Sequence, residues 1–239
     1  MTELPPFLSE TVAPDRNASV LRQTVSFNPR TWKRWLSPEL WPAELELLPI
    51  VGRFHQIDRE DVFRLSTAVG TPAGAVRSYV ATCVWGTGTA GVGVARRARP
   101  LLAHDDAGER LLKAIETLRV DGAVAAYERL QKGGDAHLTG LGPGFFTKVL
   151  YFAGWGAPAG PRPLILDRYV VLALNEQAGF NWRMNWNWTA DQYARYLETA
   201  ANWADAWGTT ADVVERALFD HGKTLARPDN PSRTMANEA

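Results

Sequence analysis

The most constraining feature of the sequence is a stretch in which three alternating glycines precede a long apolar run. Residues 138–155 read LTGLGPGFFTKVLYFAGW, with Gly140, Gly142 and Gly144 spaced two apart. Alternating glycines do not continue a helix, so we predict a tight turn between a short helix and a longer one that starts near Phe145. Such a helix start presents free backbone N–H groups and the positive end of the helix dipole, which suits phosphate binding. A plain helix–turn–helix corner would give the same pattern.

Lys148 is the only charged residue in this stretch. It lies about one turn into the predicted helix, where desolvation and the helix N-terminus both disfavour the ammonium form. A lysine with a lowered pKa supplies the free amine that attacks a sugar carbon and forms a Schiff base. The alternative is a surface lysine whose apolar stem packs along the helix while its ammonium group stays in water.

Asp167 follows nineteen residues after the lysine, beyond a Pro/Gly-rich loop at residues 156–163. Its place before an apolar helical segment suits a residue that caps the N-terminus of a helix. A carboxylate held beside Lys148 would instead stabilise an oxocarbenium-like sugar while a base departs. The sequence leaves both interpretations open.

The order PGFFTKV, Pro/Gly loop and ILD resembles the helix-hairpin-helix DNA glycosylase superfamily. Within it, the chain is most similar to the 8-oxoguanine glycosylase branch and to a compact bacterial group that includes phage-defence enzymes. The segments WGTG at 85–88 and VVERALFDHGK at 213–223 also resemble that group. One position departs from the superfamily pattern, because Phe146 stands where a second glycine usually precedes the lysine.

The resemblance implies a role for each part of the stretch. The hairpin glycines Gly140, Gly142 and Gly144 would bind a DNA phosphate, Lys148 would attack C1′ of a flipped nucleotide, and Asp167 would assist. The excised base would be an oxidised purine such as 8-oxoguanine, or a hypermodified cytosine of phage DNA in antiviral defence. A lysine–sugar intermediate would also allow cleavage of the abasic strand (AP lyase activity). The hairpin carbonyls would hold a monovalent cation.

Helical signals dominate the rest of the chain. Apolar residues recur at helical spacing in residues 105–119, and the best strand candidate is residues 45–54. Residues that suit helix N-caps are Asp58, Thr71 before Pro72, and Thr189 with Gln192 three residues later.

We therefore predict a mainly α, two-lobed helix-hairpin-helix DNA glycosylase fold with a cleft between the helical lobes. The chain, residues 1–239, would form a single glycosylase domain. One lobe would combine residues 20–57 with 161–226, and the other would be residues 58–160, which contain the hairpin. We predict a disordered tail at residues 227–239, where the sequence is polar and rich in proline.

Further candidate site residues are aromatic or basic. Aromatic side chains could wall the pocket for an extruded base, and arginines could contact DNA at its rim. Core packing is the alternative for the aromatic residues, and a solvated charge is the alternative for the arginines. The pocket candidates are Phe152, Trp85, Trp186 and Trp203, and the rim candidates are Arg30, Arg34, Arg96 and Arg97.

Composition excludes several classes of protein. Cys83 is the only cysteine, which excludes an intrachain disulfide, a cysteine-rich zinc site and a four-cysteine iron–sulfur cluster. We expect no metal in the site and no organic cofactor. Equal numbers of basic and acidic residues, 26 each, argue against a protein that coats DNA by bulk charge.

The chain has no apolar run of membrane-spanning length and no basic-then-apolar leader, so we expect a cytoplasmic monomer without membrane contact whose partner is DNA. Two other classes of function stay open. A non-catalytic helix-hairpin-helix DNA-binding module would need neither Lys148 nor Asp167. A helical adaptor for other proteins would leave the lysine in the apolar stretch unexplained.

Overall fold

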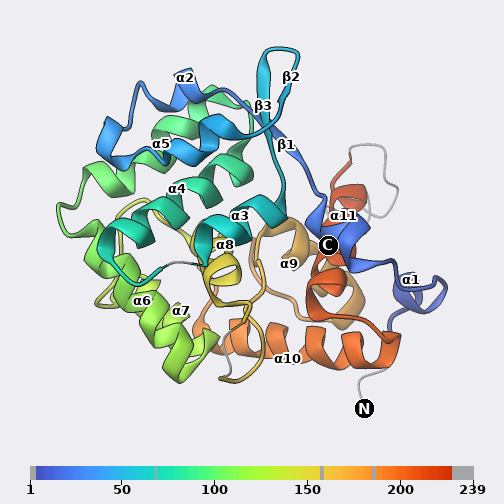
Figure 1. Cartoon of the computed structure of the whole chain (residues 1–239). Coiled ribbons are helices and arrows are strands. Elements are labelled where there is room, and N and C mark those ends of the chain that lie inside the picture. The colour runs from blue at the N-terminus through green and yellow to red at the C-terminus, as the bar shows by residue number, and fades with distance from the viewer. Residues whose placement is uncertain (1–3, 68, 157–158, 185–186, 228–239) are drawn as a thin grey trace.

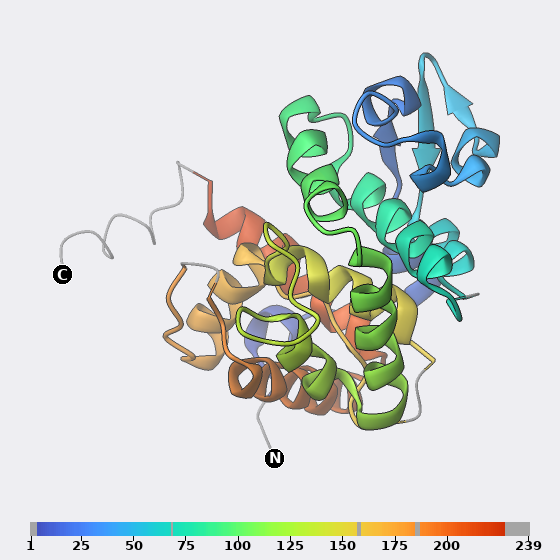
Figure 2. The ribbon, with the colours of Figure 1, turned by 90° about the vertical axis from the view of Figure 1, so that its left-hand side faces the viewer.

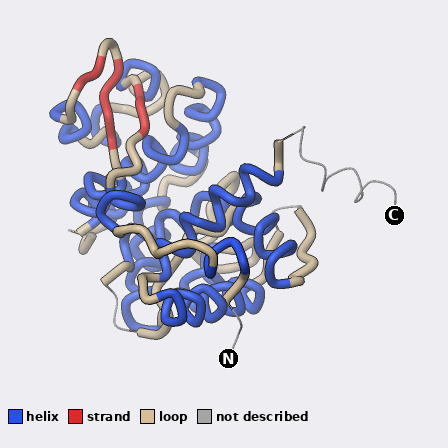
Figure 3. The backbone as a smooth tube through the Cα atoms, turned by 90° about the vertical axis from the view of Figure 1, so that its right-hand side faces the viewer, coloured by secondary structure: helices blue, strands red, loops and turns tan. Residues whose placement is uncertain are grey.

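The fold is mainly helical, with one small antiparallel sheet at one end of the molecule (Figures 1 and 3). The computed structural model describes residues 4–67, 69–156, 159–184 and 187–227. The predicted fold class is confirmed. Nearly all of the predicted tail, and the pocket candidate Trp186, lie outside the described residues.

The sheet has the strand order β1-β3-β2, with β1 spanning Val25–Phe27, β2 Ile50–Val51 and β3 Phe54–Ile57. Both pairs are antiparallel, and Val25 faces Ile57. The strand predicted over residues 45–54 is wrong in its bounds. Residues Ala43–Leu47 form a 3-10 helix (η3), and the hairpin turns at Gly52, where φ is +63°.

The segment that carries the sheet packs mainly on the central helices. Strand β1 contacts α4 (Pro72–Thr87), and α2 (Pro29–Trp32) contacts α5 (Gly91–Leu102). Figure 2 shows these elements as one group, set apart from the C-terminal helices. The division of the chain into one lobe of residues 20–57 with 161–226 and another of residues 58–160 stays a prediction. The short π-helix η1 (Asn17–Leu21) packs on the C-terminal helix α11 (Ala211–Leu225).

The central helices begin at the predicted caps. Asp58 and Asp61 form a reciprocal capping box at the start of α3 (Arg59–Ser66), and the Thr71 hydroxyl accepts a hydrogen bond from the Gly74 amide at the start of α4. Helix α4 is apolar on nearly every face and packs against α3, α6 (Ala107–Asp121) and α8 (Pro143–Gly154).

The C-terminal part is formed by α9 (Arg168–Ala178), α10 (Ala190–Trp207) and α11. The first element of the chain is the short helix α1 (Pro6–Ser9). Helix α10 begins with the predicted Thr189–Gln192 capping box. Helix α7 (Ala123–Leu130) contacts both α8 and α10 and so joins the two parts of the molecule. The connection from α7 to α8, residues 131–142, contains turns but no helix.

Helices α9 and α11 pack so closely that one contact tolerates no side chain. A Cβ on Gly222 of α11 would overlap the backbone carbonyl of Tyr169 on α9. We expect Gly222→Ala to lower the free energy of unfolding by about 1–3 kcal/mol, because backbone cannot yield as a flexible side chain does. Gly91→Ala is the matched control, since no atom lies within 4 Å of its Cβ position. Urea unfolding of both variants makes the comparison, and equal effects would contradict the close packing.

Candidate active site

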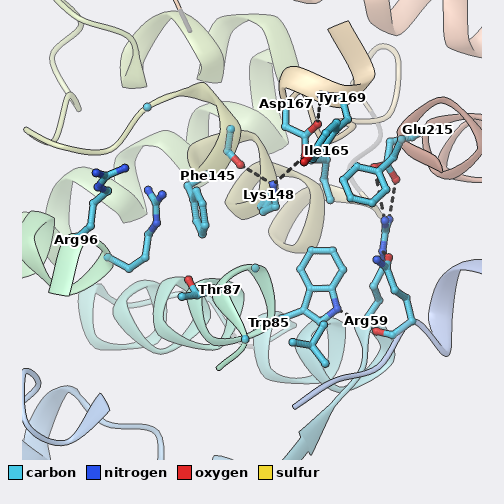
Figure 4. A pocket seen from close by; sticks show the side chains of 18 of the residues that line it. Arg59, Trp85, Thr87, Arg96, Phe145, Lys148, Ile165, Asp167, Tyr169 and Glu215 are labelled. Atoms are coloured by element: carbon cyan, nitrogen blue, oxygen red, sulfur yellow. Dashed lines mark hydrogen bonds and ion pairs between the residues drawn. The ribbon is translucent and has the colours of Figure 1, made fainter. Parts of the chain in front are cut away.

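A cavity of about 590 Å³ lies where α4, α5 and α8 face the start of α9 and one side of α11 (Figure 4). It is lined by side chains from both parts of the molecule, so folding as a whole assembles it. Its lining includes the predicted Lys148, Asp167 and all three hairpin glycines. The structure thus brings together the residues that the sequence singled out around the glycine-rich stretch.

The Lys148 amine is buried at the cavity wall, with 10% of its side chain exposed. Its Nζ donates a hydrogen bond to the Gly144 carbonyl at 2.6 Å and lies 3.8 Å from the Asp167 carboxylate (Figure 4). Burial lowers the pKa of Lys148 below its ordinary value, Asp167 and Glu215 oppose this shift, and Arg59 and Arg97 reinforce it. The free amine therefore forms at lower pH than for a surface lysine.

Asp167 uses its two carboxylate oxygens in different directions. Its Oδ1 accepts hydrogen bonds from the backbone amides of Tyr169 at 2.9 Å and Val170 at 3.2 Å, which caps α9. Its Oδ2 faces the Lys148 amine. The two interpretations left open by the sequence are thus compatible in space, because one side chain can cap the helix and face the lysine.

The segment before Asp167 is fixed to α8 and α10 by hydroxyl groups. The Thr147 hydroxyl, next to Lys148 in the chain, accepts a hydrogen bond from the Leu166 amide at 3.0 Å. The Tyr193 hydroxyl bonds both the amide and the carbonyl of Leu164, and Tyr196 donates to the Ile165 carbonyl. These bonds hold Asp167 at a set distance from Lys148.

The WGTG segment at the end of α4 forms the opposite wall. All four residues line the cavity. A Cβ on Gly86 would lie 3.0 Å from the Phe145 ring and 3.2 Å from the Lys148 side chain, so glycine lets α4 approach α8 closely. The Trp85 indole donates to the Gln23 carbonyl at 3.0 Å, which fixes its ring as a flat wall.

The hairpin opens the N-terminus of α8 toward the cavity. Gly140 has φ +89°, a conformation that favours glycine, and Gly142 is the N-cap of α8. No atom lies within 4 Å of a Cβ placed on Gly142, so this backbone is open to a ligand. Arg97 stacks on the Phe145 ring, with its guanidinium carbon 3.3 Å from the ring centroid, and Arg96 also lines the cavity. Free amides, a helix dipole and two arginines together favour an anion here.

A family model described as "Putative 8-oxoguanine DNA glycosylase OGG-like protein" matches residues 18–219. The chain belongs to this family. No curated protein and no solved structure matches this chain. At the level of the family, the activity is that of a DNA glycosylase, and the partner is DNA.

The other predicted site residues of this OGG-like chain are divided between the cavity and its surroundings. Trp85, Arg96 and Arg97 line the cavity. Phe152 does not; it packs edge-on behind Trp85, with the ring centroids 5.3 Å apart, because the next turn of α8 faces the core. Trp203 is buried within α10 and does not line the cavity either.

Arg30 and Arg34 are exposed at and just after α2, outside the lining of the cavity. Across the described residues, no three histidine, cysteine, aspartate or glutamate side chains gather as a metal site. No helix of the described part is long and apolar enough to cross a membrane.

Sequence reasoning missed a buried ion pair at the far end of the cavity. Arg59 of α3 and Glu215 of α11 lie 2.8 Å apart and both line the cavity (Figure 4). Arg59 also donates to the Gln23 side chain at 2.8 Å. Burial alone would lower the pKa of Arg59. The nearby Glu215 and Tyr151 together have the larger effect, so the pKa of Arg59 is raised. Glu215 lies in the VVERALFDHGK segment, whose sequence indicates only a resemblance to the family.

The burial of Lys148 predicts a dependence of stability on pH. Its folded-state pKa lies below that of the unfolded chain, so between the two values the unfolded chain binds more protons and stability rises with pH. We expect Lys148→Met to be more stable than the wild type at low pH, and the difference to shrink as pH rises through this window. Urea unfolding of both proteins at several pH values measures it. A difference that stayed constant would show that the amine is not destabilised by burial.

Proposed function

We propose that this chain is a DNA glycosylase with AP lyase activity, in which Lys148 is the nucleophile. The observation that supports this most directly is the Lys148 amine, buried in the cavity between the Gly144 carbonyl and the Asp167 carboxylate. A lysine of lowered pKa that faces a carboxylate is a recognised arrangement for attack on a sugar carbon. A non-catalytic DNA-binding module would have no use for a buried amine, which costs free energy.

In the proposed reaction the free Lys148 amine attacks C1′ of a nucleotide flipped into the cavity. The N-glycosidic bond breaks, its electron pair leaves with the base, and a proton released from the attacking nitrogen balances that charge. The Asp167 Oδ2, which lies 3.8 Å from this amine, would stabilise the positive charge that develops on the sugar. Ring opening gives a Schiff base, loss of a C2′ proton expels the 3′ phosphate, and water releases the amine.

DNA would be held mainly through its phosphates. The N-terminus of α8 at Gly142 and Gly144 and the arginines Arg96 and Arg97 face one end of the cavity. Arg30 in α2 and Arg34 just after it would extend this rim. We further propose that carbonyls of the hairpin hold a monovalent cation that bridges to a phosphate.

The excised base is either an oxidised purine, as the description of the family suggests, or a hypermodified cytosine of phage DNA. The first would make the protein a repair enzyme and the second an antiviral one. Trp85 supplies a flat wall for either base, and the Arg59–Glu215 pair supplies donors and acceptors at the far end of the cavity.

Borohydride trapping tests the nucleophile and the substrate together. Duplexes with 8-oxoguanine, phage DNA with modified cytosines and unmodified DNA are incubated with the protein, with and without borohydride. We expect a covalent adduct and abasic sites with one modified substrate, and no adduct with Lys148→Gln, because glutamine cannot form a Schiff base. Lys113→Gln, at an exposed lysine paired with Asp135, is the matched control.

Each other outcome has a defined meaning. An adduct that survives Lys148→Gln would place the nucleophile elsewhere. Base release without an adduct would indicate that water, not lysine, attacks the sugar. Binding without any release from every substrate in the panel would favour the non-catalytic module.

Asp167→Asn separates the helix cap from the chemistry. Asparagine keeps a capping oxygen, so we expect the melting temperature to change little. The maximal single-turnover rate should fall by about 10²-fold or more, because the charge that stabilises the transition state is lost. Since Asp167 raises the pKa of Lys148, the midpoint of the rate–pH profile should also shift to lower pH.

The control is Asp191→Asn, an exposed acidic residue in the first turn of α10. A normal maximal rate for Asp167→Asn would remove this residue from the mechanism, whatever happened to the midpoint.

A further inference from the structure

Trp35 is set apart from its neighbours by its exposure. The segment 27–41 carries three tryptophans among basic residues, and Trp32 and Trp41 are buried with 1% and 7% exposed. Trp35 is 47% exposed. Its amide donates to the Trp32 carbonyl at 2.9 Å, and the next residue, Leu36, is buried, so the backbone that holds the indole is fixed on both sides. The protein thus presents a large aromatic ring to solvent on a fixed support.

The indole forms one side of a surface groove of about 460 Å³. The groove lies between the turn after α2 and one face of α5, where Ala95, Leu102 and Ala103 supply apolar contact and Arg96 and Arg99 supply charge. A flat aromatic ring, a small apolar floor and two guanidinium groups together match a nucleotide, which has an aromatic base and an anionic phosphate.

The arginines of this groove are available for a ligand. Within the described ranges, neither Arg96 nor Arg99 forms an ion pair with a carboxylate. Arg96 also lines the candidate catalytic cavity, so the groove and the cavity lie next to each other and share this side chain. The Arg99 side chain passes 4.0 Å from the Cβ position of Gly140 in the phosphate-binding hairpin. The groove is therefore continuous with the surface that would bind DNA.

We propose that this groove binds an unpaired nucleotide of the substrate DNA, with its base stacked on Trp35 and its phosphate between Arg96 and Arg99. A base within a duplex is already covered on both faces by its neighbours, so only an unpaired base can offer a face to the indole. Extrusion of the target nucleotide leaves such unpaired DNA next to the cavity. The inference takes DNA as the ligand from the proposed function but needs none of its chemistry.

Equilibrium binding tests the groove without any base release. Fluorescence anisotropy compares a fully paired duplex with the same duplex carrying a short single-stranded gap. We expect Trp35→Ala to weaken binding to the gapped DNA by about tenfold and to change binding to the paired duplex much less. Trp35→Phe should restore most of the affinity, because phenylalanine keeps a ring for stacking. Leu47→Ala, at an exposed apolar residue of a different surface hollow, is the matched control.

The salt dependence separates stacking from charge. Arg99→Gln should weaken binding to both DNAs and reduce the slope of log affinity against log salt by about one, whereas Trp35→Ala should leave the slope unchanged. Equal loss for paired and gapped DNA with Trp35→Ala, or no loss, would overturn the stacking site. Either result would leave the Lys148 chemistry intact, since borohydride trapping tests that separately.

Discussion

The burial of one amine is the constraint on which the arrangement of the site depends. A lysine removed from water costs free energy unless polar groups replace its hydration. The fold supplies the Gly144 carbonyl on the same helix and the Asp167 carboxylate at the start of α9, and it lets α4 approach through Gly86. These partners compensate the amine only in part, because the pKa of Lys148 is still lowered. The unfavourable remainder shifts the equilibrium of this nitrogen toward the free amine.

The Arg59–Glu215 pair has a different physical role, although it is buried in the same cavity. Desolvation can offset much of the attraction within a buried ion pair, so such a pair is weak evidence for stability. Its geometry is specific, however, because it joins α3 to α11 and adds the Gln23 side chain to the same guanidinium. A second network, from Arg16 through Asp212 to Tyr151, ties the start of η1 and α8 to α11. Together these bonds fix α11 as a wall of the cavity.

The sequence predicts those parts of the site that local order determines. Lys148 and Asp167 were found because a lone charge, a Pro/Gly loop and a capping position are all visible in one stretch, and the capped helices began where expected. Arg59 and Glu215 were not found in this way, because 156 residues separate them in the sequence. Each also lies on an amphipathic helix, where a charged residue normally indicates a solvent-exposed position. Phe152 and Trp85 show the same limit: both are aromatic residues of apolar helices, and only the packing of α4 on α8 decides which ring faces the cavity.

Asp167 shows how the fold and the chemistry depend on each other. A helix cap fixes a carboxylate in place, because two backbone amides hold one of its oxygens. The second oxygen is then directed at Lys148 without any further side chain to orient it. The Thr147–Leu166 hydrogen bond links α8 to the segment that precedes α9, immediately beside this amine and carboxylate, so their separation follows from backbone packing. In the proposed reaction, a pair positioned in this way would need little rearrangement, which is the condition under which electrostatic stabilisation is most effective.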